Sequence, residues 1–100
     1  MEKLFLIRPD FQDKDRNDNA KYFCPPCALI EGVLTIYPQL REKMEVQYVN
    51  FQRPRPSIIQ LIGEENQSCP VLILSDKTFI NEPEEILKYF AKAYGIGNAH

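Results

Sequence analysis

The tetrapeptide Cys24-Pro25-Pro26-Cys27 is the stretch of this sequence that says most about its fold. Two cysteines separated by two residues form a Cys-x-x-Cys motif. Proline fits the first turn of a helix, because the backbone amides there have no partner within the helix. We therefore predict that a helix begins at this motif, with Cys24 at its N-cap.

The residues that follow the motif have the spacing of a helix that packs on a sheet. Pro38 interrupts this pattern, so we expect the helix to kink or stop near Tyr37. The predicted core face consists of Leu29, Val33, Ile36, Tyr37 and Leu40, widened by Ile30 and Leu34. An apolar stripe of this width predicts close packing against a sheet.

The rest of the chain alternates between strand patterns and helix patterns. Runs of apolar or β-branched residues predict strands at 3–9, 45–51, 70–74 and 77–80, and a short helix is predicted at 57–62. A last helix is expected to begin with Asn81 as its N-cap and Glu84 in capping-box position. Gly95 is the expected end of this helix.

The resulting order, β-α-β-α-β-β-α, predicts an α/β fold with a four-stranded mixed sheet and helices on both faces. The first β-α-β unit requires a right-handed parallel crossover, and the last two strands are close enough for a hairpin. Residues 10–23 form a polar connection that is long for a compact domain, and such loops are often functional. A chain of 100 residues fits one domain spanning 1–100.

The composition argues against several functional classes. The formal net charge is −2, whereas a nucleic-acid-binding protein needs a basic surface. No apolar run approaches the roughly 18 residues of a membrane span. The apolar run at the N-terminus is also too short for a signal peptide. We therefore expect a cytoplasmic protein with no nucleic-acid and no membrane partner.

The two cysteines of the motif carry the predicted chemistry. A cysteine at a helix N-cap points its sulfur at free amides and at the positive end of the helix dipole, and both favour the thiolate. Cys24 is therefore the candidate attacking thiol of a thiol–disulfide oxidoreductase. Cys27, one turn further along, is the candidate resolving thiol. Because Pro25 and Pro26 have no N–H, we expect fewer amide donors near Cys24 than in a motif with one proline.

Other interpretations of the cysteines stay open. The motif would be half of a zinc site only if four ligands were present, and only Cys69 and the terminal His100 remain. Cys69 itself is predicted to act as a small buried apolar residue. Its alternatives are a third redox thiol or, together with the motif, a ligand of zinc or of an iron–sulfur cluster. A non-catalytic binding module, with the pair as a reversible redox switch, is a further alternative.

The element order, the position of the Cys-x-x-Cys motif after the first strand and Pro70 at the start of the third strand together resemble the thioredoxin superfamily. The resemblance covers residues 3–95 and is closest to glutaredoxins and to the N-terminal domain of glutathione transferases. The whole chain also resembles a small bacterial group of thioredoxin-like proteins with no established activity. The resemblance implies a thioredoxin-like fold and a redox-active disulfide.

The resemblance also implies roles for individual residues. In this family the proline at the position of Pro70 is cis and faces the two cysteines, so Pro70 and the adjoining Cys69 are expected to shape the substrate site. In glutathione transferases an acidic residue followed by serine holds the γ-glutamyl carboxylate of glutathione, and here Glu82 is followed by Pro83. The implied substrates are a protein disulfide or a glutathione-like thiol, with no bound cofactor.

Three further side chains are candidates for the substrate site. Arg53 and Arg55 follow the second strand, and the carboxyl ends of parallel strands open on the same edge of a sheet. Both would then lie near Cys24, although a solvated loop stiffened by prolines is the favoured interpretation. Phe23 is expected to anchor the preceding polar loop or to form an apolar rim for a partner.

Overall fold

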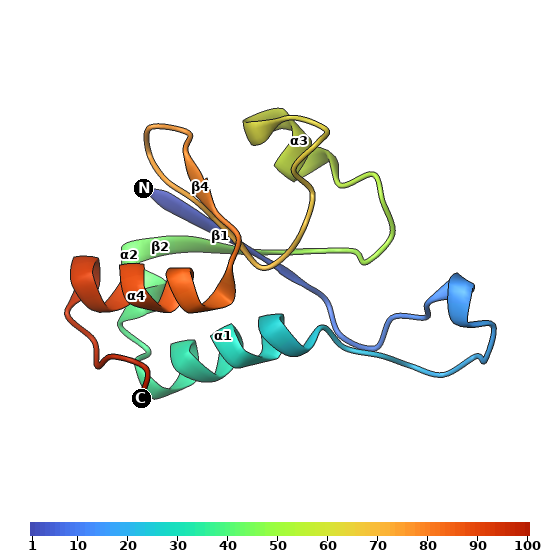
Figure 1. The fold of residues 1–100 in the computed structure, drawn as a ribbon, viewed down its shortest axis with the longest axis horizontal. Helices are drawn as coiled ribbons and strands as arrows, with labels where there is room; N and C mark the ends of the chain where they lie inside the picture. Colours follow the sequence, from blue (N-terminus) through green and yellow to red (C-terminus); the bar gives the residue numbers. More distant parts are fainter.

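The computed structural model describes residues 1–100 and contains one four-stranded mixed sheet in the order β2-β1-β3-β4 (Figure 1). β1 (Glu2–Ile7) pairs in parallel with β2 (Met44–Val49) and antiparallel with β3 (Val71–Ile73). β3 in turn pairs antiparallel with β4 (Phe79–Ile80). The predicted α/β class and the mixed sheet are therefore confirmed.

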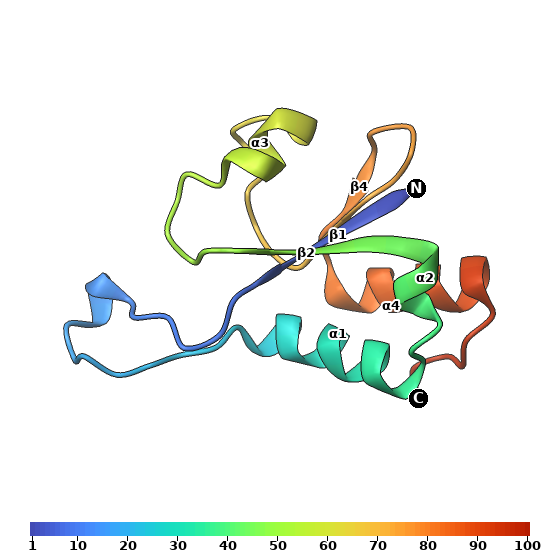
Figure 2. The same ribbon diagram turned by 180° about the vertical axis from the view of Figure 1, so that it is seen from behind.

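Helices cover both faces of this sheet. α1 (Pro25–Ile36) and α4 (Pro83–Tyr94) lie on one side, and α3 (Pro56–Ile62) lies on the other, as both ribbon views show (Figure 1, Figure 2). A single extra turn, α2 (Leu40–Lys43), leads into β2. The arrangement is otherwise the predicted one and is compatible with the thioredoxin-like fold. None of the helices combines the length and the apolar character that a membrane crossing needs.

β1 is the central strand of the hydrophobic core. Leu4, Phe5 and Leu6 are at most 1% exposed, because helices cover the sheet from both sides. A strand buried on both faces has a continuous apolar sequence, which is the pattern that predicted it. The core is one cluster of 18 buried residues drawn from β1, β2, β3 and the helices on both faces.

The buried face of α1 differs from the predicted one. Ile30 and Leu34, at the margin of the predicted stripe, are fully buried, whereas Leu29 and Ile36 are 50% and 70% exposed. The reason is the rotation of the helix, which turns Cys27 toward the sheet. Side chains three and seven positions later lie on the same face as Cys27, so they enter the core instead.

The start of α4 also differs from the prediction. Its N-cap is Glu82 rather than Asn81, and no side chain forms a capping hydrogen bond. Pro83 occupies the first helical position, where its missing N–H is not needed, so the predicted capping box does not form. Asn81 instead donates from Nδ2 to Ser68 Oγ at 3.2 Å. This bond ties the start of α4 to the segment that precedes β3.

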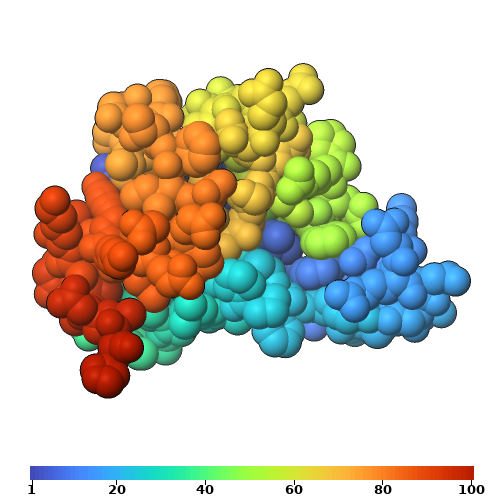
Figure 3. Space-filling model, viewed as in Figure 1, coloured from blue at the N-terminus to red at the C-terminus, as the bar shows by residue number.

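Residues 10–23 have more local structure than their polar sequence indicates. Phe11 and Tyr22 pair in an isolated antiparallel bridge, and the ring of Phe11 stacks on that of Phe51 with centroids 4.2 Å apart. A short 3-10 helix, Lys14–Arg16, lies further out. The loop projects beside the segment that follows β2 (Figure 3). Its base is therefore anchored to the body of the protein, near the end of β1.

The observed face of α1 gives a paired test of stability. Leu34→Ala removes fully buried groups and should lower the free energy of unfolding by about 2–5 kcal/mol. Leu29→Ala, on the exposed side of the same helix, should change it by less than about 0.5 kcal/mol. Urea unfolding of both variants measures the difference. A larger loss for Leu29→Ala would mean that the predicted stripe faces the core after all.

Candidate functional site

The start of α1 lies at the edge of the sheet where β1 and β2 end. These strands run parallel with Ile7 opposite Val49, so their carboxyl ends meet at this edge. The antiparallel pairing of Phe5 with Val71 brings Pro70, directly before β3, to the same edge. The topology therefore gathers the loops after β1, after β2 and before β3 around the Cys-x-x-Cys motif.

Cys24 is the N-cap of α1, as predicted. Its backbone is extended, with φ of −84° and ψ of 110°, and its Sγ accepts the backbone N–H of Cys27 at 3.3 Å. Pro25 and Pro26 occupy the first two helical positions. Because prolines have no N–H, the amide of Cys27 is the first of the helix that can reach this sulfur. The partly buried Cys24 thiol thus lies at the positive end of the dipole of α1.

Cys27 lies one turn further into α1 and is only 4% exposed. The backbone N–H of Ile7, the last residue of β1, donates to Cys27 Sγ at 3.5 Å. Burial raises the pKa of the Cys27 thiol well above its ordinary value, and the hydrogen bond with Cys24 raises it further. Cys27 is therefore a covered, protonated thiol directly behind the more accessible Cys24.

The Cys69–Pro70 segment adjoins Cys24. The bond between these two residues is cis, as the resemblance implied, and Pro70 is buried. The Cys24 thiol donates to the carbonyl oxygen of Cys69, with 3.9 Å between sulfur and oxygen. Cys69 is partly rather than fully buried. Burial raises the pKa of its thiol to about 11, and the positive charge of Arg55 opposes this rise.

The two arginines after β2 have different environments. Arg53 is exposed, which fits the solvated-loop interpretation, but Arg55 is only 5% exposed, so that interpretation is wrong for Arg55. The guanidinium of Arg55 donates to the carbonyl oxygens of Asn50, Phe51 and Gln67. Its backbone N–H donates to Gln67 Oε1 at 2.8 Å. Arg55 is therefore a buried cation that ties the segment after β2 to the segment before β3.

An open groove of about 360 Å³ runs beside Cys24. Its walls are mainly apolar and include Leu6, Ile7, Pro9, Phe23, Cys27 and Ala28. Phe23 is 59% exposed and has the position expected of an apolar rim. A second hollow of about 260 Å³ borders Cys24 on the side of the 10–23 loop. The Cys24 sulfur thus lies between two surfaces that a substrate can contact.

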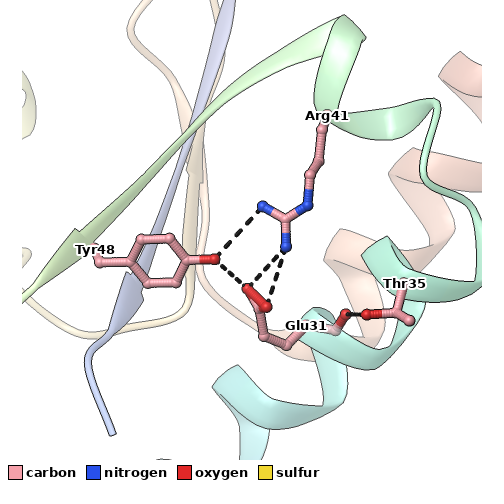
Figure 4. A network of polar contacts seen from close by, with 4 residues as sticks. All are labelled: Glu31, Thr35, Arg41 and Tyr48. Carbon is pink, nitrogen blue, oxygen red and sulfur yellow. Dashed lines mark hydrogen bonds and ion pairs between the residues drawn. The ribbon is translucent and has the colours of Figure 1, made fainter.

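A polar network lies along the first groove and was not singled out from the sequence (Figure 4). Glu31 of α1 accepts hydrogen bonds from Arg41 at 3.1 Å and from the hydroxyl of Tyr48. Thr35 donates its hydroxyl to the backbone carbonyl of Glu31 at 3.0 Å. Glu31 and Tyr48 both line the groove. Because the members of the network come from three elements, α1, α2 and β2, no local spacing in the sequence indicates it.

Glu82 lies apart from the cysteine groove. It is an exposed residue at the start of α4. It lines a separate hollow of about 770 Å³, together with residues of β4 and α4 such as Phe79 and Tyr89. None of the three cysteines lines that hollow. The structure therefore does not bring Glu82 together with the groove beside Cys24.

The side chains that commonly ligate metals are not clustered. No group of three or more histidine, cysteine, aspartate or glutamate side chains is arranged to hold a metal ion. The geometry therefore does not favour a zinc or iron–sulfur carrier that uses Cys24, Cys27 and Cys69.

The fold and the paired thiols define an α/β protein with a dithiol at a helix N-terminus. The chain belongs to the family described as Protein of unknown function (DUF3088), whose model matches residues 1–98. No match is found among curated proteins or among solved structures. The description of the family assigns no activity, so the function has to be argued from the site.

Burial predicts the order in which the thiols react with an alkylating reagent. At neutral pH, iodoacetamide should modify Cys24 before Cys27, because Cys27 is covered and its raised pKa keeps it protonated. Raising the pH should speed the labelling of Cys27 and Cys69 as their thiols lose protons. Mass spectrometry of peptides after timed labelling gives the order, and unfolding in urea should erase it. Modification of Cys27 before Cys24 in the folded protein would contradict this arrangement.

Proposed function

We propose that this protein is a thiol–disulfide oxidoreductase of the thioredoxin superfamily, with Cys24 as the attacking thiol and Cys27 as the resolving thiol. The observation that carries the proposal is the hydrogen bond from the Cys27 N–H to Cys24 Sγ at 3.3 Å. This hydrogen bond places the Cys24 sulfur at the positive end of α1, with the Cys27 thiol one turn further into the helix. The segment that carries Cys69 and Pro70 lies beside Cys24, which supports the same assignment.

The first step is the attack of Cys24 on a substrate disulfide. The Cys24 thiolate forms a bond to one substrate sulfur, the substrate S–S bond breaks, and the departing thiolate takes up a proton. The Cys24 sulfur lies at the positive end of α1, and the N–H of Cys27 already donates to the atom that attacks. The product is a mixed disulfide between Cys24 and the substrate.

The second step releases the substrate. Cys27 loses its proton, its sulfur bonds to the Cys24 sulfur, and the second substrate thiolate leaves and is protonated. The N–H of Ile7 favours the Cys27 thiolate, which burial otherwise disfavours. The substrate has gained two electrons, and the Cys24–Cys27 pair has lost two. Two glutathione-like thiols, or one dithiol, then reduce the pair and are themselves joined in a disulfide.

The groove beside Cys24 supports a protein disulfide as the substrate. Its apolar walls and the exposed ring of Phe23 would bury an apolar side chain next to the attacked sulfur. A glutathione-like thiol fits the role of the reductant that restores the pair. Glu82 lies outside this groove, so we assign it no part in binding either one.

Serine variants test the assigned roles in a disulfide-reduction assay with insulin and dithiothreitol. Cys24→Ser should reduce the rate to that of the uncatalysed reaction, because no other thiol occupies the helix N-cap. Cys27→Ser should attack the substrate disulfide as fast as the wild type but release the second substrate thiol more slowly. Lys43→Gln, an exposed change in α2, is the control for surface substitution.

Two outcomes would count against the proposal. If Cys24→Ser reduces the substrate at the wild-type rate, the proposed oxidoreductase activity is wrong. A dithiol that acts only as a redox switch would then be the better interpretation. If Cys24→Ser and Cys27→Ser slow the attack on the substrate disulfide equally, the assigned attacking and resolving roles are wrong. The buried Cys27 thiol would then be needed before the mixed disulfide forms.

A further inference from the structure

Arg55 is the one charged side chain among the buried residues, and no carboxylate pairs with it. Its guanidinium donates only to backbone carbonyl oxygens, which are neutral acceptors. A buried cation costs free energy unless an anion balances it. Burial accordingly lowers the pKa of Arg55 from its ordinary value. A nearby group that can become negative would therefore lower the free-energy cost of burying Arg55.

The groups that can supply a negative charge near Arg55 are thiols. Gln67 binds Arg55 through both its side-chain oxygen and its backbone carbonyl, and it precedes Cys69 by two residues. The guanidinium thus lies against the segment that carries Cys69. Among the three thiols, Cys69 interacts most strongly with the charge of Arg55, ahead of Cys27 and Cys24. The largest influences on the pKa of Arg55, after burial, come from Cys69, Arg53, Cys27 and Cys24 rather than from a carboxylate.

Cys69 also adjoins the attacking cysteine. Its carbonyl oxygen accepts a hydrogen bond from the Cys24 thiol, with 3.9 Å between the oxygen and the sulfur. Cys24 therefore has a second cysteine beside it, which comes from the loop before β3 rather than from α1. The two neighbours differ in environment. Cys27 is buried beneath the end of β1, whereas Cys69 is partly exposed and the positive charge of Arg55 lowers the pKa of its thiol.

We propose that Cys69 is a second resolving thiol for Cys24 and that Arg55 balances the negative charge of its thiolate. The inference rests on the proposed function, because it needs a mixed disulfide at Cys24. Cys69 loses its proton to solvent and its sulfur bonds to the Cys24 sulfur. The bond between Cys24 and the substrate sulfur breaks, and the substrate thiolate leaves and takes up a proton. The substrate has again gained two electrons, now at the expense of Cys24 and Cys69.

The two oxidised forms can interconvert by thiol–disulfide exchange. The Cys27 thiolate attacks Cys24 in the Cys24–Cys69 disulfide, forms the Cys24–Cys27 bond and releases Cys69 as a thiolate beside Arg55. A thiol whose thiolate is stabilised leaves faster, so Arg55 favours this direction of exchange. The Cys24–Cys69 disulfide is therefore expected to be transient when Cys27 is present and to accumulate when Cys27 is absent.

The Cys27→Ser variant makes the second resolving step visible. The protein is treated with one equivalent of an aromatic disulfide, 5,5′-dithiobis(2-nitrobenzoate), and its intact mass is followed over time. The initial adduct should give way to a protein that is two hydrogens lighter and carries no adduct. Peptide mapping without reduction should then find Cys24 joined to Cys69. In Cys27→Ser/Cys69→Ser, the matched control, the adduct should persist.

Substitutions of Arg55 in the Cys27→Ser protein test the counter-charge. Arg55→Gln should slow the loss of the adduct about tenfold, since raising the pKa of the attacking thiol by one unit lowers its thiolate fraction tenfold. Arg55→Lys keeps the positive charge and should keep most of the rate. Circular dichroism establishes that each variant folds.

The pH profile separates an electrostatic role from a structural one. The charged or titratable groups that influence the pKa of the Cys69 thiol are Arg55 and Arg53, which lower it, and Cys24, which raises it. Loss of the adduct should speed up as the pH rises, and Arg55→Gln should shift this rise to higher pH. A rate lowered equally at every pH would overturn the role of Arg55. If Arg55→Gln does not fold, a rate independent of pH in the Cys27→Ser protein would overturn it instead.

The proposed function and this inference fail on different results. Unchanged turnover in Cys24→Ser removes both, because the mixed disulfide would not form at Cys24. Suppose that insulin reduction requires Cys24 and Cys27, but that the adduct on Cys27→Ser persists. Only the proposed role of Cys69 is then wrong, and the proposed function stands. An adduct-free Cys27→Ser protein without a Cys24–Cys69 link would also overturn that role.

Discussion

The N–H of Ile7, at the end of β1, donates to the sulfur of Cys27, and this contact joins the start of α1 to the central strand of the sheet. With Cys27 turned toward the central strand, Ile30 and Leu34 enter the core below it, and Leu29 faces outward. The same rotation leaves Cys24, one turn earlier, at the edge of the sheet with its sulfur partly accessible. One rotation of the helix therefore accounts for the burial of Cys27, for the packing of α1 and for the exposure of Cys24.

A second constraint is polar and lies in the loops. Arg55 holds the segment after β2 against the segment before β3 through its hydrogen bonds to Asn50, Phe51 and Gln67. No buried side-chain nitrogen or oxygen in the protein lacks a hydrogen-bond partner, so the hydrogen-bonding cost of burying this guanidinium is met. Its charge has no carboxylate partner, and its hydrogen bond to the backbone of Gln67 places it beside the segment that carries Cys69. Packing of the site and its electrostatics thus depend on the same residue.

Much of the fold could be predicted because its signals are local. The start of α1 follows from two prolines that need no amide partner, and β1 from an apolar run that suits a strand covered on both faces. Gly95 ends α4 with a φ of 73°, a left-handed conformation that glycine adopts readily. The rotation of α1 could not be predicted in this way, because its sequence is apolar over more than one face. The choice between Leu29 and Leu34 as the buried residue depends on what the helix meets.

The sequence by itself determined the order of the elements and the place of Cys24 at a helix N-cap, because periodicity and proline chemistry act over a few neighbouring residues. Only the tertiary structure decided that Arg55 is buried, that Cys69 adjoins Cys24, and that Glu31 pairs with residues of α2 and β2. Each of these contacts joins segments brought together by strand pairing and helix packing. A charged residue in a proline-rich loop has the same local sequence whether the surrounding chain leaves it in water or folds over it.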